Sequence, residues 1–276
     1  MAGQLPKNIG VDQTKIKLSQ DSLKPSELTV NGTYAVEGED AYLKVSITAN
    51  DKEECPPTDL VCVVDISGSM GDTCAGITDG KTQYVDLGFS LLDLVKHSLK
   101  TIIKTCRPMD RLCLILFDDQ CALAFDFMNM TAQNQNLAFV AVDQLQPRDS
   151  TNIYNALQKA INTVNERDDK QRNPAILFFT DGVPNVSPAR GESEALKKIK
   201  RKLKFTCPIH TYGFGMYNRL NSSMLFDIAV IFGGMNGYIS DPTNIGTTFV
   251  NSIANILTTA AVDVKLSLGG AVNLSR

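Results

Sequence analysis

The stretch VCVVDISGSMGD, Val61–Asp72, decides how the rest of this sequence is interpreted. Four apolar residues are followed by Asp65 and then by Ser67 and Ser69, with Gly68 between the two serines. An apolar run of this kind is typical of a strand covered on both faces. The loop after it can turn the carboxylate and both hydroxyls toward one point, and such hard oxygen donors favour a small divalent cation. A catalytic nucleophile and a helix cap are the alternatives at this stage.

The composition is that of a globular protein. The chain has 276 residues, of which 43% are hydrophobic and 21% are charged, enough for one large domain and a smaller appendage. The formal net charge is −3, and the only basic run is KKIKRKLK, at 197–204. We therefore expect no nucleic-acid partner. No apolar run approaches the roughly 18 residues that a membrane span requires, so no membrane span is expected.

The cysteines predict a reducing compartment. There are seven, and they form neither a CxxC pair nor a Cys/His cluster with zinc spacing. Several lie in or at the start of apolar runs, where a free cysteine behaves as a small hydrophobic residue. The first residues also lack the apolar core of a secretory signal. We expect an intracellular, cytoplasmic protein with free thiols.

Between about Leu60 and Ala261, short apolar runs alternate with longer helical patterns. This order predicts an α/β fold, a Rossmann-like doubly wound and mostly parallel sheet flanked by helices, whose ligands bind outside the carboxyl ends of the strands. The expected strands are Leu60–Val64, Arg111–Phe117, Cys121–Met128, Ala175–Thr180, Pro208–Phe214 and Gly237–Ile239. The expected helices are Gln83–Thr105, Ala132–Leu145, Ile153–Arg167, Pro188–Lys204, Asn221–Phe232 and Gly246–Thr259.

The flanks of this region have a different pattern. We expect a polar N-terminal segment over 1–27, a β flank over 28–57, the α/β domain over 58–261 and a C-terminal β flank over 262–276. Both β flanks alternate apolar and polar residues with a period near two, as hairpin strands do. Because an isolated hairpin is marginally stable, we expect the flanks to pair into a small β unit.

Two further strand ends carry oxygen ligands. The motif FFTDGVPN places Asp181 directly after an expected strand, and QPRDSTNIYNAL places Thr151 directly before an expected helix. With Asp65, Ser67 and Ser69, this set resembles the metal-ion-dependent adhesion site, or MIDAS, of von Willebrand factor type A domains. That family's pattern is DxSxS, then a Thr in a second loop and an Asp in a third. The resemblance covers about three quarters of the chain.

The resemblance implies a cation site and a partner. Ser67 and Ser69 would bind Mg²⁺ directly and Thr151 directly or through water, while Asp65 and Asp181 would act mostly through water; Mn²⁺ or Ca²⁺ could replace Mg²⁺. One open coordination position would accept an Asp or Glu of a protein ligand, within a larger intracellular assembly. Gly68 and Gly182 would support the tight turns of the site loops. The chain would then be a binding module rather than an enzyme.

Other interpretations stay open at this point. Ser67 or Ser69 could cap the following helix, Thr151 or Ser150 could cap the next one, and Asp181 could be an ordinary turn residue. A Mg²⁺-dependent phosphatase or phosphotransferase is an alternative function, although its usual DxDx[TV] pattern is not present because Ser67 stands at the second Asp. A third alternative is a purely structural domain whose site is permanently occupied.

Several other features receive secondary roles. The segment 71–82 departs from the family pattern and is expected to form an exposed loop that affects partner choice. Asp118 and Asp119 could support the cation site, and His97 and His210 are expected to be structural. The basic run at 197–204 is most often a solvated helix face, but it could meet an acidic surface. By the resemblance, the last helix could shift when metal and ligand bind.

Overall fold

The computed structural model describes residues 17–19, 29–37, 40–48, 55–77, 84–148, 150–205, 207–215, 220–239, 245–259 and 265–267. The chain divides into two compact units. One is Cys55–Thr259, and the other combines Met1–Glu54 with Ala260–Arg276. Within the described residues, no helix is both long enough and apolar enough to cross a membrane.

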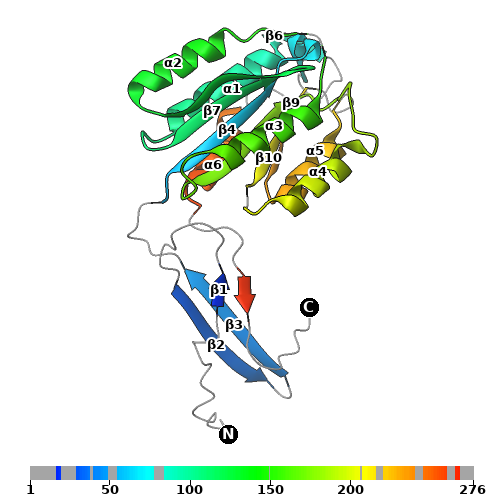
Figure 1. Cartoon of the computed structure of the whole chain (residues 1–276). Coiled ribbons are helices and arrows are strands. Elements are labelled where there is room, and N and C mark those ends of the chain that lie inside the picture. Colours follow the sequence, from blue (N-terminus) through cyan, green and yellow to red (C-terminus); the bar gives the residue numbers. More distant parts are fainter. Residues whose placement is uncertain are drawn as a thin grey trace. The chain divides into compact units, whose positions relative to one another are not determined.

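The larger unit is built on a six-stranded sheet with the order β11-β10-β9-β4-β7-β8 (Figure 1). All neighbouring strands are parallel except β8, which pairs antiparallel with β7 at one edge. This confirms the expected mostly parallel α/β fold. The strands are β4 (Thr58–Asp65), β7 (Arg111–Phe117), β8 (Cys121–Asn129), β9 (Asn173–Thr180), β10 (Ile209–Phe214) and β11 (Asn236–Ile239).

Helices cover both faces of this sheet. One apolar core contains residues of α1, α2 and α6, and a second core on the other face contains residues of α3, α4 and α5. The helices are α1 (Leu91–Thr105), α2 (Ala132–Asp143), α3 (Ile153–Glu166), α4 (Gly191–Lys202), α5 (Ser222–Phe232) and α6 (Ile245–Leu257). Burial on both faces explains why β4 is apolar throughout its centre.

The expected start of the first helix, at Gln83, was wrong. Residues Tyr84–Ser90 form strand β6, which pairs antiparallel with β5 (Thr73–Ile77), and α1 begins only at Leu91. The reason is a capping box: the Ser90 hydroxyl accepts from the Asp93 backbone N–H, and the Asp93 carboxylate accepts from the Ser90 backbone N–H. The described part of the segment 71–82 is therefore mostly strand rather than loop, and residues 78–82 lie outside the described residues.

The smaller unit contains two strand pairs. Strands β2 (Thr29–Glu37) and β3 (Asp40–Thr48) form an antiparallel hairpin. Strands β1 (Lys17–Ser19) and β12 (Lys265–Ser267) also pair antiparallel, so the two flanks of the chain meet. The partner of the C-terminal strand lies in the polar segment 1–27, where the sequence shows no strand pattern, and not in the alternating segment 28–57.

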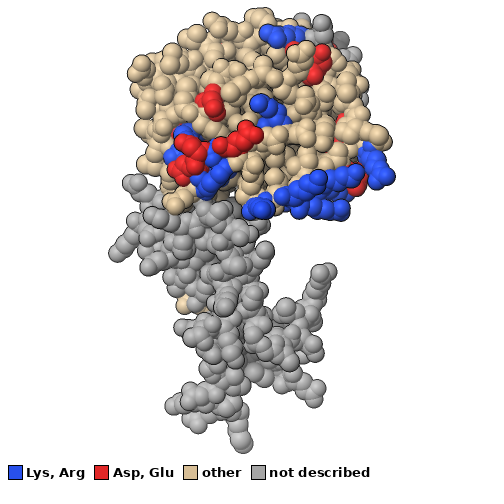
Figure 2. Space-filling view, in the orientation of Figure 1, with Lys and Arg blue, Asp and Glu red and all other residues tan. Residues whose placement is uncertain are grey.

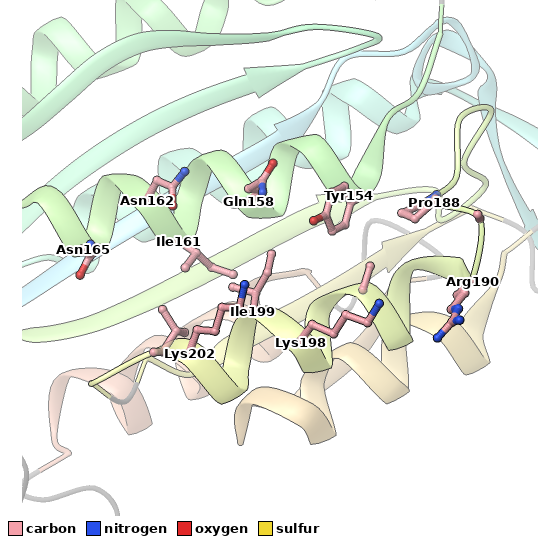
Figure 3. A pocket seen from close by; sticks show the side chains of 13 residues that line it. Tyr154, Gln158, Ile161, Asn162, Asn165, Pro188, Arg190, Lys198, Ile199 and Lys202 are labelled. Atoms are coloured by element: carbon pink, nitrogen blue, oxygen red, sulfur yellow. The ribbon is translucent and has the colours of Figure 1, made fainter.

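Helix α4 carries much of the positive charge in the larger unit. Figure 2 shows basic side chains gathered along this helix, whose last turn contains Lys200, Arg201 and Lys202. Its neighbour on the same face of the sheet is α3, and a groove separates the exposed sides of the two helices (Figure 3). The described residues on the α3 side of the groove are uncharged, and most of them are polar.

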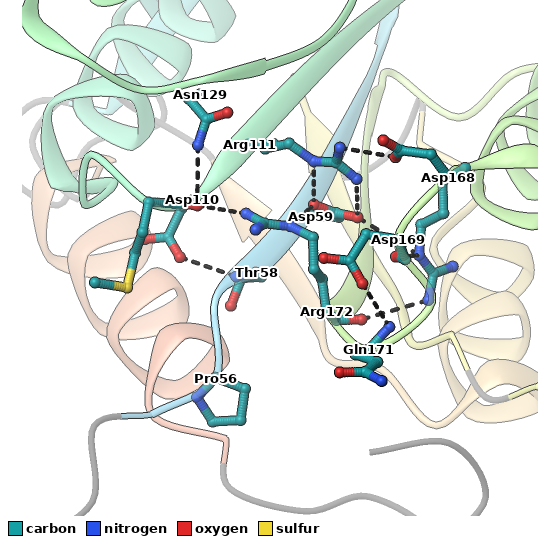
Figure 4. A network of polar contacts seen from close by, with 12 residues as sticks. Pro56, Thr58, Asp59, Asp110, Arg111, Asn129, Asp168, Asp169, Gln171 and Arg172 are labelled. Carbon is teal, nitrogen blue, oxygen red and sulfur yellow. Dashed lines mark hydrogen bonds and ion pairs between the residues drawn. The ribbon is translucent and has the colours of Figure 1, made fainter. Parts of the chain in front are cut away.

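At the amino end of the sheet, a buried carboxylate is surrounded by arginines (Figure 4). Asp59 is fully buried and accepts two hydrogen bonds from the Arg111 guanidinium, at 2.9 and 2.8 Å. Arg172 donates a third at 2.6 Å, and Arg167 lies 3.5 Å from the same carboxylate. Arg111 comes from β7, whereas Arg167 and Arg172 both come from the connection between α3 and β9, so this cluster ties together β4, β7 and that connection.

Candidate metal centre

The site residues lie at the carboxyl ends of two neighbouring strands. Asp65 is the last residue of β4, and Asp181 directly follows Thr180, the last residue of β9. These strands pair side by side in register through Val64 and Phe179. The fold therefore brings together two acidic residues that are more than a hundred positions apart in the sequence.

Asp65 is a buried carboxylate held by neutral groups. It has no exposed surface, and its two oxygens accept from the Ser67 backbone N–H at 2.9 Å and from the Thr180 hydroxyl at 2.5 Å. Among the described residues, no lysine, arginine or histidine pairs with it. Burial raises the pKa of Asp65 to about 7, against the lowering effect of its hydrogen bonds with Ser67 and Thr180, and the charge of Asp181 adds to the rise.

The two serines link Asp65 to Asp181. The hydroxyl oxygens of Ser67 and Ser69 lie 3.3 Å apart, in and beside the short 3-10 helix η2 (Gly68–Gly71). Ser67 is buried, Ser69 is exposed, and Ser69 makes a hydrogen bond with the Asp181 carboxylate. Ser67 occupies the N-cap position of η2 but makes no capping hydrogen bond through its side chain. The cap that starts α1 is Ser90, so capping does not explain either serine.

Asp181 is a second carboxylate without a basic partner in the described residues. It is half-buried, and one of its oxygens accepts weakly from the Val183 backbone N–H at 3.4 Å. Burial raises the pKa of Asp181, although the hydrogen bond with Ser69 lowers it; the nearby charge of Asp72 adds to the rise. Negative charge is thus concentrated around the serine hydroxyls, and among the described residues no basic side chain pairs with Asp65 or Asp181.

Thr151 reaches the same edge of the sheet through its backbone. It is almost fully buried, and its carbonyl oxygen accepts from the backbone N–H groups of Asn185 and Val186, at 3.0 and 3.2 Å. Within the described residues its hydroxyl makes no hydrogen bond. The N-cap of α3 is Asn152, whose side chain accepts from the Asn155 backbone N–H. Thr151 is therefore next to the loop that carries Asp181, and its hydroxyl is not used as a cap.

Backbone hydrogen bonds connect the loops of the site. The Arg148 N–H donates to the Ile66 carbonyl, and the Asn152 N–H donates to the Asp118 carbonyl at 2.8 Å. The Asp118 carboxylate accepts from the Gln120 N–H and lies 3.8 Å from the Arg148 guanidinium. Asp118 thus supports the Thr151 loop through its main chain, while no such contact is described for Asp119.

The two glycines differ. Gly182 has a φ of +80°, and a Cβ there would lie 2.9 Å from a methyl carbon of Leu220, so the position favours glycine on two grounds. Gly68 is the exposed first residue of η2 and is not among the described glycines with a positive φ. The expected need for glycine is therefore visible at Gly182 only.

Thr180 is a positioning residue that was not among the predicted ligands. Its hydroxyl donates to Asp65 and accepts from the Gly182 backbone N–H at 2.9 Å, so it couples the ends of both strands. The sequence signal is a Thr in the last position of a strand, next to the acidic residue of the loop. The histidines lie elsewhere: His97 is on α1, and the buried His210 accepts from the Met235 backbone N–H at 3.2 Å.

The donor set suits a hard cation. Hydroxyl and carboxylate oxygens are the ligands that Mg²⁺ and Ca²⁺ prefer, and a cation here would neutralise carboxylates that otherwise repel one another. No group of three or more His, Cys, Asp or Glu residues with the geometry of a metal site occurs within the described residues. Any cation bound at this edge would therefore depend on the neutral hydroxyls of Ser67, Ser69 and Thr151.

Comparisons with known proteins agree with this fold. Residues 60–183 match the family model of the von Willebrand factor type A domain. The uncharacterized protein YfbK of Escherichia coli (strain K12) is 28% identical over 229 residues, which are 82% of this chain and 36% of that protein. The chain thus spans about a third of the length of that relative.

Solved structures of similar fold have low sequence identity. A von Willebrand factor type A protein from Catenulispora acidiphila superposes with a TM-score of 0.62 at 16% identity, over 88% of this chain and 49% of that one. Proximal thread matrix protein 1 of the mussel byssus, in a structure described as having a zinc-occupied MIDAS motif, gives a TM-score of 0.54 at 17% identity, over 74% of this chain and 47% of that one.

The family match begins inside β4, which starts at Thr58, and ends just beyond Asp181. It therefore includes every loop of the candidate site. The mostly parallel sheet with helices on both faces agrees with the fold of the structural neighbours. Domains of this family are generally non-enzymatic modules for protein interaction. Over residues 60–183 the chain is thus similar to the von Willebrand factor type A domain.

Proposed function

We propose that this domain binds a divalent cation through Asp65, Ser67, Ser69, Thr151 and Asp181, and that the bound cation holds an Asp or Glu of a partner protein. The observation that carries the proposal is the buried Asp65 carboxylate. It has no basic partner in the described part of the chain, and it is connected to Asp181 through the two serines. A buried charge of this kind is costly unless something compensates it.

Hydroxyl ligands also suit the capture of a partner's carboxylate. Ser67, Ser69 and Thr151 would contribute no charge, so the cation would keep much of its attraction for an anionic ligand. The exposed position of Ser69 supports access from solvent. The zinc-occupied MIDAS motif of the mussel protein adds an argument from a similar fold. Mg²⁺ is the proposed cation, and Mn²⁺ or Ca²⁺ would fit the same oxygen ligands.

The proposal describes a binding module and not an enzyme. Neither histidine is among the described residues that contact the site loops. The histidines therefore do not supply a general base for a serine nucleophile. None of the seven cysteines, all of which lie in the described residues, forms a disulfide, which supports the proposal of an intracellular protein.

Calorimetric titration of Mg²⁺ and Mn²⁺ into EDTA-treated protein tests the cation site. We expect saturable binding to the wild type and its loss in Asp181→Ala. Asp119→Ala is the matched control, because it removes an exposed acidic residue next to β7, and it should bind the cation like the wild type. A folded wild type that binds neither cation would contradict the proposal, and so would equal binding by Asp181→Ala.

The partner requirement is tested with labelled peptides that carry a single Glu or, as control, Gln. Glu-dependent binding in Mg²⁺ that EDTA reverses is the expected result. Binding that does not distinguish Glu from Gln would remove the acidic-ligand part of the proposal and leave the cation site intact. A site that retains its cation through purification and exchanges no ligand would instead favour the structural alternative.

A further inference from the structure

The groove between α3 and α4 lies on the face of the sheet that α3, α4 and α5 cover, and none of its lining residues takes part in the candidate metal centre. It has a volume of about 600 Å³. Its α4 side carries Arg190, Lys198 and Lys202, and no acidic residue is among the described residues that line it. Figure 3 shows Lys198 and Lys202 on one helix and Gln158 and Asn162 on the other.

The three basic side chains of the groove lack a direct partner, although the charges of Lys198 and Glu194 interact. Arg190, Lys198 and Lys202 are exposed, and their side chains make no hydrogen bond or ion pair with any described residue. This differs from Lys197, the residue before Lys198, which forms an ion pair with Glu194 at 2.6 Å. The positive charge along the groove is therefore available to an anionic ligand.

The rest of the lining favours a peptide over a more highly charged polymer. Ile161, Ile199 and Leu203 form an apolar part of the wall, which a phosphate backbone would not contact favourably. Opposite the lysines, Gln158, Asn162 and Asn165 follow one another at intervals of four and three residues on α3, so their amides share one helix face. A side-chain amide offers both a donor and an acceptor, as a peptide backbone requires.

The spacing on both helices fits an extended chain. Residues four apart on a helix are about 6 Å apart along its axis, which applies to Lys198 and Lys202 and to Gln158 and Asn162. Alternate residues of an extended peptide are about 6.7 Å apart. Two acidic side chains at positions i and i+2 of such a peptide would therefore face the two lysines, and its backbone would face the amides.

We propose that the α3–α4 groove binds an extended acidic peptide segment of a partner protein, with Lys198 and Lys202 pairing with acidic residues at i and i+2. Arg190, eight residues before Lys198, extends the basic wall toward one end of the groove. This site is separate from the proposed cation site and needs no metal, so the partner could make two independent contacts with the domain.

The test is fluorescence anisotropy in EDTA with a labelled peptide of about ten residues that alternates Glu with Ala or Leu, long enough to span the groove when extended. The same peptide with Gln for Glu is the control ligand. We expect saturable binding of the Glu peptide, weakened about tenfold or more in Lys198→Glu/Lys202→Glu. Circular dichroism shows whether each variant is folded, which we expect because both lysines are exposed.

The matched control variant is Lys197→Glu/Arg201→Glu. It makes the same change in charge at the same spacing on α4, but neither residue lines the groove. It should bind the peptide much more tightly than Lys198→Glu/Lys202→Glu. Equal weakening by both variants would mean general attraction to a basic helix and would overturn the proposal, as would the absence of peptide binding by the wild type.

Two further arms distinguish other ligands and the proposed cation site. Tighter binding of a single-stranded oligonucleotide, or of vesicles containing anionic lipid, than of the Glu peptide would overturn the proposal in favour of that ligand. Asp181→Ala should leave peptide binding in EDTA unchanged, whereas Lys198→Glu/Lys202→Glu should leave calorimetric Mg²⁺ binding unchanged. These measurements can therefore contradict the proposal for one site and leave the proposal for the other intact.

Discussion

Strand β4 carries a fully buried aspartate near each end, and the two carboxylates have opposite surroundings. Asp59, at the amino end, is surrounded by Arg111, Arg167 and Arg172, at distances from 2.6 to 3.5 Å. Asp65, at the carboxyl end, has hydrogen bonds with the neutral groups of Ser67 and Thr180, and the charge that acts on it is that of the acidic Asp181.

The difference separates a structural charge from one that we interpret as functional. The fold itself compensates Asp59, because arginines from β7 and from the chain between α3 and β9 converge on it. It leaves Asp65 uncompensated within the described residues, at the edge of the sheet where ligands of parallel α/β proteins bind. A buried charge left without its counter-charge costs stability, which a bound cation would restore.

The largest effect should follow from breaking the Asp59 cluster. Asp59→Asn leaves three arginines near one another without their buried anion, and we expect the free energy of unfolding to fall by about 3–5 kcal/mol. Urea denaturation measures this directly. Asp168→Asn is the matched control, since Asp168 also pairs with Arg111 but is exposed, and it should change the free energy of unfolding little. Similar losses in both variants would argue against a special role for the buried pair.

Asp65→Asn should have the opposite sign in metal-free protein. The single amide oxygen of asparagine can still accept from the Ser67 N–H, and its NH2 group can donate to the second lone pair of the Thr180 hydroxyl. Since a buried charge is removed, at pH 8 in EDTA we expect the free energy of unfolding to rise by about 2 kcal/mol. The pKa of Asp65, about 7, lies above its ordinary value of 3.8. The contribution of Asp65 to the free energy of unfolding of the wild type is therefore fully present below about pH 4, and it is lost as the pH rises through 7.

The gain from Asp65→Asn should accordingly shrink when the same urea denaturation is repeated at pH 5, where the wild-type carboxyl is protonated. A variant that is less stable than the wild type at pH 8 in EDTA would mean that the charge of Asp65 is already compensated. That result would remove the contrast with Asp59.

A smaller effect should come from the glycine that shapes the Asp181 loop. Gly182→Ala places a side chain at a φ of +80° and close to Leu220, whereas Gly191→Ala has nearly the same φ, +76°, and nothing within 4 Å of the new Cβ. The shared backbone cost is about 1 kcal/mol, and the contact with Leu220 should add about another 1 kcal/mol at Gly182. Thermal unfolding of the two variants measures the difference, and equal losses would show that Leu220 gives way freely.

The sequence predicted one end of β4 better than the other. Asp65, Ser67 and Ser69 form a local motif, and the ends of parallel strands bring Asp181 to it, so the candidate ligands could be named without a structure. The partners of Asp59 could not be named in this way, because arginines far apart in the chain converge only after the tertiary fold has formed. Their sequence positions carry no periodic signal that points to one carboxylate.

Local structure near the site shows a similar limit. The apolar runs that became β4, β7, β9 and β10 were identified because burial on both faces requires them. The expected start of α1 at Gln83 was wrong, because residues 84–90 form β6 instead of the first turns of the helix. The Ser90-x-x-Asp93 capping box was the available signal for the true start. Thr180 was noticed at the strand end, but its bond to Asp65 depends on the pairing of β4 with β9.

The most direct test of the central claim, that Asp65 receives its counter-charge from a bound cation, is the effect of Mg²⁺ on stability. Urea denaturation of the wild type and Asp65→Asn would be compared in EDTA and in saturating Mg²⁺. We predict that Mg²⁺ raises the unfolding midpoint of the wild type and leaves that of Asp65→Asn unchanged. An unchanged wild type, or an equal rise in both proteins, would contradict the claim.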